Sequence, residues 1–112
     1  MIRPSDSLLG THLNSVWMEG TLVSDPVDLL DGNGPPTCSF RIEAHQNWEP
    51  ASVFLVEATD QALDGCRPRL GTGLGVRIIG RLHQRRWLDP QGHLKKEVKI
   101  VGELVEPLGV TL

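Results

Sequence analysis

Apolar and polar residues alternate along several stretches of the chain, as they do in strands that bury one face. The clearest alternation covers residues 76–87, where Val76, Ile78 and Leu82 share one side. The other side carries Arg77, Ile79, Arg81, His83, Arg85 and Trp87. The same reasoning predicts further strands over residues 14–23, 38–45, 51–59 and 93–106. Gly20 inside the first of these predicts a bulge or a sharp bend.

The segments between these strands are rich in turn formers. Residues 24–37 (SDPVDLLDGNGPPT) predict a loop or hairpin tip, with Asp31-Gly32-Asn33-Gly34 at its positive-φ positions. Asp89-Pro90-Gln91-Gly92 predicts a tight turn. Residues 60–70 are the only candidate helix. Asp60 is a possible cap, and Gly65 and Pro68 limit the helix to about two turns.

Together these elements predict an all-β domain with one short helix. Regularly spaced short strands suggest a barrel or a sandwich. The helix position, between the third and fourth strands, favours a five-stranded Greek-key barrel of the oligonucleotide-binding kind (OB-fold). We expect this domain over residues 14–107, preceded by a leader (1–13) and followed by a short C-terminal end (108–112) without an acidic tail.

The net charge of −3 argues at first against a nucleic-acid partner, but the charge is unevenly distributed. Acidic residues dominate from Met1 to Cys66, where the basic residues are Arg3 and Arg41. Basic residues dominate from Arg77 to Lys99. An acidic total therefore does not exclude nucleic-acid binding if the basic half lines a groove.

Trp87 ends the most basic strand. Unpaired DNA presents flat bases, which stack on aromatic rings, and phosphates, which attract Arg and Lys. The candidate DNA-contacting residues are Trp48, Trp87, Arg41, Arg77, Arg81, Arg85, Arg86, Lys95 and Lys96. The competing interpretation is a solvated charged hairpin with one exposed tryptophan. We favour DNA binding because an exposed indole on a basic strand otherwise has little reason to be there.

The other two tryptophans have different surroundings. Trp48 lies in a short predicted connection, where it either stacks a base or folds back as a plug over the barrel mouth. Trp17 lies between Val16 and Met18 in the first strand. We expect it to pack in the core or against another subunit, and Val16, Trp17 and Met18 are the candidate oligomer interface.

Other classes of function find no supporting motif. The four histidines and two cysteines show no metal-ligand spacing, so no metal or other cofactor is expected. The glycines of GTGLG follow the predicted helix and precede a strand, the wrong order for a nucleotide-phosphate loop. No nucleophile–base pair is apparent, and we expect no enzyme activity. The absence of a signal peptide pattern or a long apolar run favours a cytoplasmic protein without a membrane partner. Cys38 and Cys66 are expected to be free thiols rather than a disulfide.

The sequence resembles the bacterial single-stranded DNA-binding protein family from Asn14 to Pro107. The matching pieces are NSVWMEGTLVSDP, CSFRIEAHQNW and GVRIIGRLHQRRWLDPQG, in this order, and the spacing from Gln61 to His83 also matches. The resemblance implies an OB-fold barrel, assembled as a homotetramer or possibly a dimer. It also implies sequence-independent binding of single strands in replication, repair and recombination, in association with the bacterial nucleoid.

Two departures from the family pattern affect this expectation. Trp48 and Trp87 stand at two of the family's three base-stacking regions, but the third strand carries Val53, Leu55, Glu57 and Thr59 instead of aromatics. Weaker binding or a smaller site is expected. The family's acidic tail, which recruits replication and repair proteins, is not present in EPLGVTL, so such partners are uncertain. The alternative is a primosome-type accessory barrel that acts mainly as a protein-interaction module.

Overall fold

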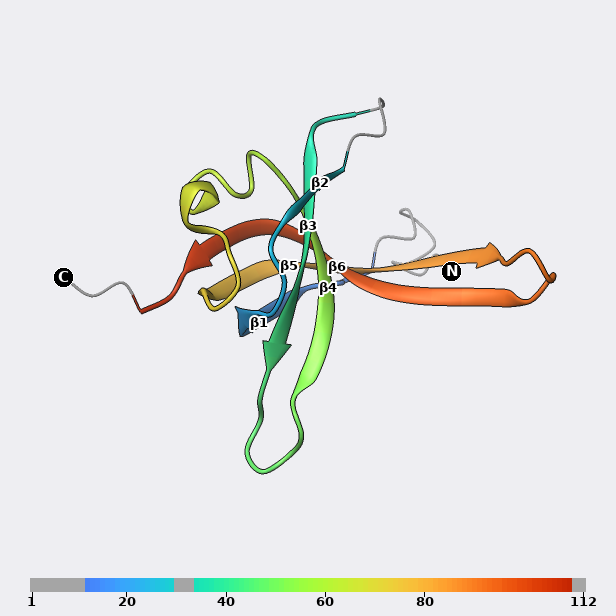
Figure 1. Cartoon of the computed structure of the whole chain (residues 1–112), viewed down its shortest axis with the longest axis horizontal. Coiled ribbons are helices and arrows are strands. Elements are labelled where there is room, and N and C mark those ends of the chain that lie inside the picture. The colour runs from blue at the N-terminus through green and yellow to red at the C-terminus, as the bar shows by residue number, and fades with distance from the viewer. Residues whose placement is uncertain (1–11, 30–33, 110–112) are drawn as a thin grey trace, which may run out of the picture.

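The computed structural model describes residues 12–29 and 34–109. Its elements are the strands β1 (Val16–Leu22), β2 (Val27–Leu29), β3 (Thr37–Ala44) and β4 (Ser52–Thr59), the 3₁₀ helix η1 (Arg67–Arg69), and the strands β5 (Gly75–Leu88) and β6 (Leu94–Pro107). The sheet order is β1-β5-β6-β4-β3-β2, and β1 also pairs with β3. This last pairing closes a ring of five strands, so the predicted five-stranded barrel is confirmed (Figure 1).

β1 closes the barrel because it changes partner near its end. It pairs with β5 from Val16 to Thr21 and with β3 at Thr21 and Leu22. A Cβ atom on Gly20 would lie 2.8 Å from the carbonyl oxygen of Glu43, so this close approach requires glycine. No register shift occurs in β1. The irregularity lies instead between Ile79 and Gly80 in the β5–β6 pairing. Of the two alternatives predicted at Gly20, a bulge or a sharp bend, the bulge is therefore wrong.

Alternate residues of the strands point into the barrel and form its core. The largest of these buried side chains are Leu22, Phe40, Ile42, Val56, Ile78 and Ile100. The strands predicted over residues 38–45 and 51–59, and the inward face predicted for the first half of 76–87, are therefore confirmed.

The helix predicted over residues 60–70 is wrong. This segment forms consecutive turns and then η1, whose three residues are its only helix. Gly65 and Pro68 disfavour an α-helix here, and the side chain that accepts the Ala62 N–H is Thr59 rather than Asp60. The segment still seals one end of the barrel, because Leu63 and Cys66 are completely buried.

The loop predicted over residues 24–37 contains a strand. β2 pairs with β3 from Val27 to Leu29 and extends the sheet beyond the barrel ring. Gly34 has a positive φ of 90°, as expected, whereas Asp31, Gly32 and Asn33 lie outside the described residues. Most of the predicted leader and the end of the chain also lie outside them.

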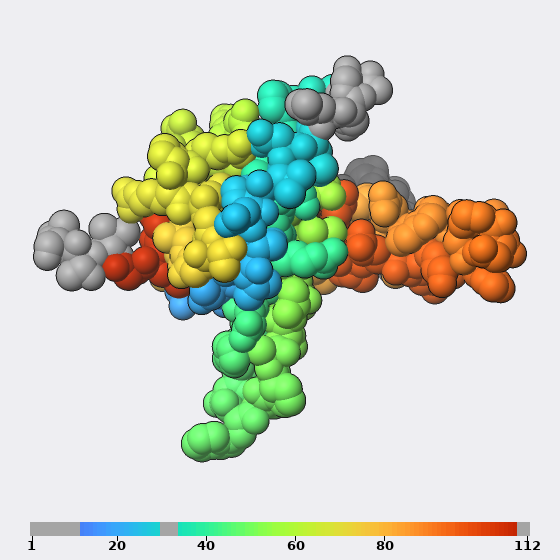
Figure 2. All heavy atoms as spheres, in the orientation of Figure 1, coloured from blue at the N-terminus to red at the C-terminus, as the bar shows by residue number. Residues whose placement is uncertain are grey.

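Two hairpins project from the barrel. One joins β3 to β4, and the other is the far part of β5 and β6, residues 82–100, called here the arm (Figures 1 and 2). Every residue from Arg81 to Leu88 is exposed. In the described ranges no helix is long and apolar enough to cross a membrane.

Candidate nucleic-acid interface

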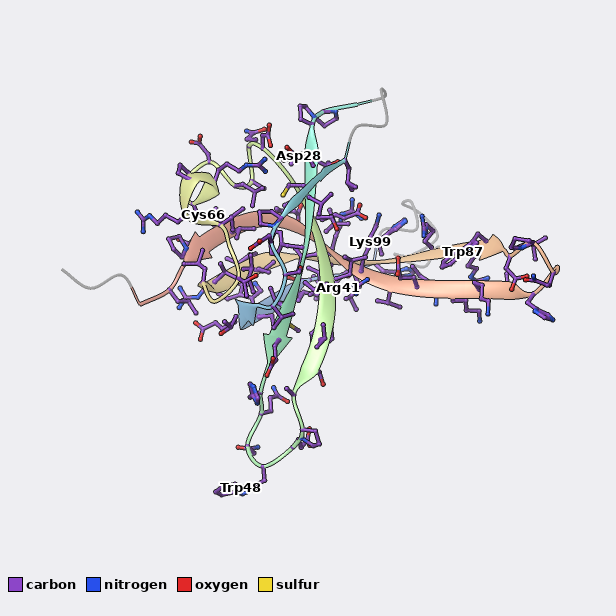
Figure 3. The ribbon with its side chains drawn as sticks, viewed as in Figure 1. Asp28, Arg41, Trp48, Cys66, Trp87 and Lys99 are labelled. Carbon is purple, nitrogen blue, oxygen red and sulfur yellow. The ribbon has the colours of Figure 1, made fainter. Side chains whose placement is uncertain are left out.

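A row of residues crosses the outer face of four neighbouring strands. Arg41 lies opposite Leu55, Leu55 is paired with Lys99, and Lys99 lies opposite His83. Residues paired across adjacent strands share a face, and neighbouring strands are about 4.8 Å apart. Figure 3 shows Arg41 and Lys99 where the two projecting hairpins meet the barrel. The row therefore links the β3–β4 hairpin to the arm.

The arm continues this outer face toward its tip. Arg81, His83, Arg85 and Trp87 alternate along β5, and Lys95 lies directly opposite Trp87. We call the set Arg41, Lys99, His83, Arg81, Arg85, Trp87 and Lys95 the basic track. It brings the candidates Arg41, Arg81, Arg85, Trp87 and Lys95 onto one surface.

Trp87 carries the one indole ring on the basic track. Its side chain is 39% exposed, and the Arg85 guanidinium carbon lies 4.4 Å from the ring centroid. This cation–π contact places a positive charge beside the ring. A nucleobase that stacks on the free side of the indole would therefore have its phosphate next to a cation.

The cations on the track differ in how far they are already neutralised. Lys99 Nζ lies 2.6 Å from Glu57 Oε1, with both side chains largely buried. Arg85 lies 3.8 Å from Glu97, and Lys95 lies 3.8 Å from Asp89. In both pairs the basic side chain is exposed. Arg41 and Arg81 have no side-chain partner in residues 12–29 and 34–109. Exposed pairs contribute little, so most of these cations remain available for phosphates.

Arg77 and Arg86 lie elsewhere. Arg77 binds Glu19 with contacts of 3.1 and 2.8 Å, on the part of β5 that pairs with β1. Arg86 and Lys96 lie opposite each other on the reverse face of the arm. The structure thus does not bring these three sequence-predicted residues together with the basic track.

Trp48 is 98% exposed at the end of the β3–β4 hairpin (Figure 3). It does not cover the barrel mouth, so the plug interpretation is wrong for this chain. A turn holds the loop, in which Glu49 N–H donates to the Gln46 carbonyl over 3.0 Å and Asn47 has a positive φ of 51°. An indole without contacts is free to stack on a ligand.

Trp17 is not in the core. It is 75% exposed and lies opposite Ile79, which in turn lies opposite Leu104, so an apolar row crosses the outer face of β1, β5 and β6. Val16 and Met18 point inward and pack against the core. A cavity of about 330 Å³ lies beside Trp17, between β1 and the β3–β4 hairpin, with Met18 and Phe54 in its lining.

The comparison with known proteins agrees with this geometry. Residues 13–108 match the model of the Single-strand binding protein family. The chain belongs to this family.

Two known proteins illustrate what the chain is similar to. A protein described as single-stranded DNA-binding protein from Aquifex aeolicus (strain VF5) is 28% identical over 101 residues, which cover 83% of this chain and 68% of the relative. A solved structure titled Plasmodium falciparum SSB complex with ssDNA superposes with a TM-score of 0.77 at 18% identity. It covers 88% of this chain and 97% of its own, and it shows that the fold is shared.

The sequence alone did not indicate that Lys99 belongs to the basic track. Lys99 reaches the row through the parallel pairing of β4 with β6, whose partners are far apart in sequence. Its signal was the alternation in β6, where Lys95, Glu97 and Lys99 share a face. For the same reason the sequence did not predict that Glu57 pairs with Lys99.

The other titratable groups of the described residues offer no metal site. No cluster of three or more His, Cys, Asp or Glu in the described part of the chain could hold a metal ion. Cys38 and Cys66 are buried free thiols, as predicted, and burial raises the pKa of each.

Proposed function

We infer that this family member binds single-stranded DNA without sequence preference. The observation that carries this inference is the exposed Trp87–Arg85 pair on a surface that continues into Arg81, His83 and Lys99. The printed descriptions of the two similar proteins, one a single-stranded DNA-binding protein and one a complex with single-stranded DNA, support it.

The chemistry of the basic track explains both the affinity and the lack of sequence preference. Every base has a flat face that can stack on Trp87, and Trp48 offers a second ring at the end of the other hairpin. Arginine and lysine neutralise phosphates and release counterions. These contacts use features that all nucleotides share. In duplex DNA the base faces are already stacked, so the indoles have nothing to bind.

The direct test compares single-stranded and duplex DNA of the same sequence by fluorescence anisotropy. We expect preference for the single strand, and a log–log salt slope of about −3 if about four phosphates are neutralised. Trp87→Ala should weaken binding by about 1–3 kcal/mol. Equal affinity for duplex would contradict the proposal. Unchanged DNA affinity in Trp87→Ala would favour the protein-interaction alternative.

The biological setting follows from this chemistry. A protein that covers exposed bases reversibly would protect unpaired DNA during replication, repair and recombination in the cytoplasm. The test is the DNA-damage sensitivity of cells in which Trp87→Ala replaces the native residue. Sensitivity equal to that of the parent strain would contradict this role.

Self-association through β1 would extend the DNA-binding surface. Trp17, Ile79 and Leu104 form an apolar row, and the edge of β1 from Val16 to Glu19 pairs with no other described strand on its far side. Open edges and apolar rows favour contact with a second copy. We expect a dimer or tetramer by sedimentation, which Trp17→Glu should dissociate. A monomer at micromolar concentration would contradict it.

A further inference from the structure

The cavity of about 330 Å³ at the base of the β3–β4 hairpin lies apart from the basic track. Its lining comes from residues 17–19 of β1 and from residues between 44 and 54, on the hairpin that extends downward from the barrel in Figure 1. We call it the hairpin cavity. Its size is at the lower end of the range for ligand pockets, about 300–1,000 Å³, and suits a single side chain. Of the described residues that line it, none belongs to the basic track.

The floor of the hairpin cavity is apolar and formed in advance. Met18 of β1 and Phe54 of β4 line it, and both pack against the barrel core. Trp17 adds an aromatic wall and is 75% exposed, so much of its indole surface is open to a ligand. Because the floor is part of the folded barrel, a ligand does not have to order it, which lowers the cost of binding.

The polar groups of the hairpin cavity favour a cation. Glu19 and Glu49 contribute carboxylates, and no lysine or arginine is among the described residues of the lining. Arg77 binds Glu19 over 2.8 Å, whereas the Glu49 carboxylate forms no ion pair or hydrogen bond within residues 12–29 and 34–109. His45, which also lines the cavity, lies 2.6 Å from the carboxylate of Glu43. The cavity therefore keeps a negative charge, which repels the phosphates of DNA.

The chemistry of the lining distinguishes between cations. A metal ion is not favoured, because the described residues form no group of three or more His, Cys, Asp or Glu that could hold one. A guanidinium fits better, since it is planar, stacks on aromatic faces and donates paired N–H groups to a carboxylate. Trp17 and Glu49 offer these two partners. A lysine ammonium is more strongly hydrated and has no flat face to stack.

The source of such a guanidinium is an arginine of a partner protein. Arginine and tryptophan are both enriched among the residues that contribute most to protein interfaces. A second copy of this chain that pairs with β1 would bring its own β1, in which Glu19 is the one charged residue. It would add a negative charge beside a negative cavity. Charge complementarity therefore favours a different protein with an exposed arginine.

We propose that the hairpin cavity binds an arginine side chain of a partner protein, with the guanidinium stacked on Trp17 and its N–H groups directed at Glu49. This site goes beyond the proposed DNA binding and does not depend on it. Because the cavity and the basic track share no residue, the chain can hold a partner protein and single-stranded DNA at the same time.

The test titrates the isotope-labelled full chain with the peptide acetyl-Gly-Arg-Gly-amide and follows the titration by NMR. The control is the same peptide with citrulline, which has the shape of arginine without its charge. We expect the Trp17 indole N–H signal, assigned by its absence in Trp17→Phe, and the Glu49 backbone amide signal to shift with the arginine peptide alone. Equal shifts with the citrulline peptide would overturn the inference, since the cavity would then not recognise the charge.

Glu49→Gln removes the carboxylate charge and keeps the side-chain size. We expect it to weaken binding of the arginine peptide about three- to fivefold, as for an exposed ion pair. Its melting temperature should equal that of the parent, because Glu49 is exposed. Glu103→Gln is the matched control, with the same change of charge on β6, outside the cavity. Equal peptide affinities in the two variants would contradict the assignment of Glu49.

Two other occupants of the hairpin cavity give different results. If a second copy fills it, Glu49→Gln changes the oligomer mass in sedimentation without peptide. If DNA fills it, Glu49→Gln changes the affinity for oligothymidine more than Glu103→Gln does. Either result would overturn the inference. Failure of the parent to bind single strands would instead overturn the proposed function and leave the arginine site intact.

Discussion

Lys99 on β6 donates a hydrogen bond of 2.6 Å to Glu57 on β4, in the middle of the basic track. The side chains are only 18% and 25% exposed, so water screens this pair less than the other ion pairs of the track. We therefore expect Glu57 to compete with phosphate for Lys99 and to weaken DNA binding at the centre of a surface that is otherwise basic.

Glu57→Gln should release Lys99 to a phosphate. We expect tighter binding of oligothymidine at low salt and a salt slope steeper by about 0.7, the contribution of one more phosphate. Salt-dependent anisotropy titrations measure this. Glu103→Gln is the control, since Glu103 is an exposed acid on β6 that forms no ion pair within residues 12–29 and 34–109. Equal slopes in the two variants would argue against competition at Lys99.

Trp48→Ala should weaken DNA binding without affecting stability. Its ring is nearly fully exposed, so truncation removes a stacking surface but no packing. The expected loss is about 1–3 kcal/mol of binding free energy, and Trp48→Phe should retain most of it because it keeps a flat ring. Titration with oligothymidine and thermal unfolding measure the two effects. If Trp48→Ala binds as tightly as the parent, the β3–β4 hairpin lies off the DNA path.

Gly80→Ala should destabilise the barrel where the arm leaves it. A Cβ at Gly80 would lie 2.0 Å from the carbonyl oxygen of Val101, so the β5–β6 pairing must shift. Overpacking of this kind costs about 1–3 kcal/mol or more, measurable by urea unfolding. Gly65→Ala is the matched control, because nothing lies within 4 Å of its added Cβ and its φ is not positive. A Gly80→Ala variant as stable as Gly65→Ala would contradict the close approach.

Asp25 should make stability depend on acid pH. Its carboxylate accepts hydrogen bonds of 3.0 Å from the Thr72 backbone N–H and hydroxyl, which lower its pKa below the ordinary 3.8. The contribution is complete above 3.8 and is lost as the pH falls through the lower, folded-state pKa. Asp25→Asn should therefore melt below the parent at neutral pH, with a difference that shrinks in acid. A constant difference from neutral to acid pH would show that the ionised carboxylate contributes nothing.

The strands could be predicted from the sequence because alternation is a local signal. The alternation over residues 76–87 predicted both the buried face and the basic face of β5. The residues from Asp89 to Gly92 predicted the turn. The turn is held as expected, with the Asp89 carboxylate accepting the N–H groups of Gln91 and His93.

The pairing of the strands could be predicted less well from the sequence than the strands themselves. Lys99 lies beside Leu55 and Glu57 because the parallel β4–β6 pairing brings their strands together. These strands are far apart in the sequence, so alternation within either one does not reveal the contact. The division of the arm into two faces also separates Arg86 from Arg85, although they are neighbours in sequence. The helix predicted over residues 60–70 is wrong because Gly65 and Pro68 outweigh the possible cap at Asp60, and the segment forms turns and η1 instead.

The proposed DNA binding depends most on a base that stacks on Trp87 beside Arg85. The most direct measurement is a fluorescence titration of Trp17→Phe/Trp48→Phe, in which Trp87 is the sole indole, with oligothymidine in low-salt buffer. We expect strong quenching that saturates and is reversed by salt. Emission that stays constant while anisotropy of labelled DNA shows binding would contradict it.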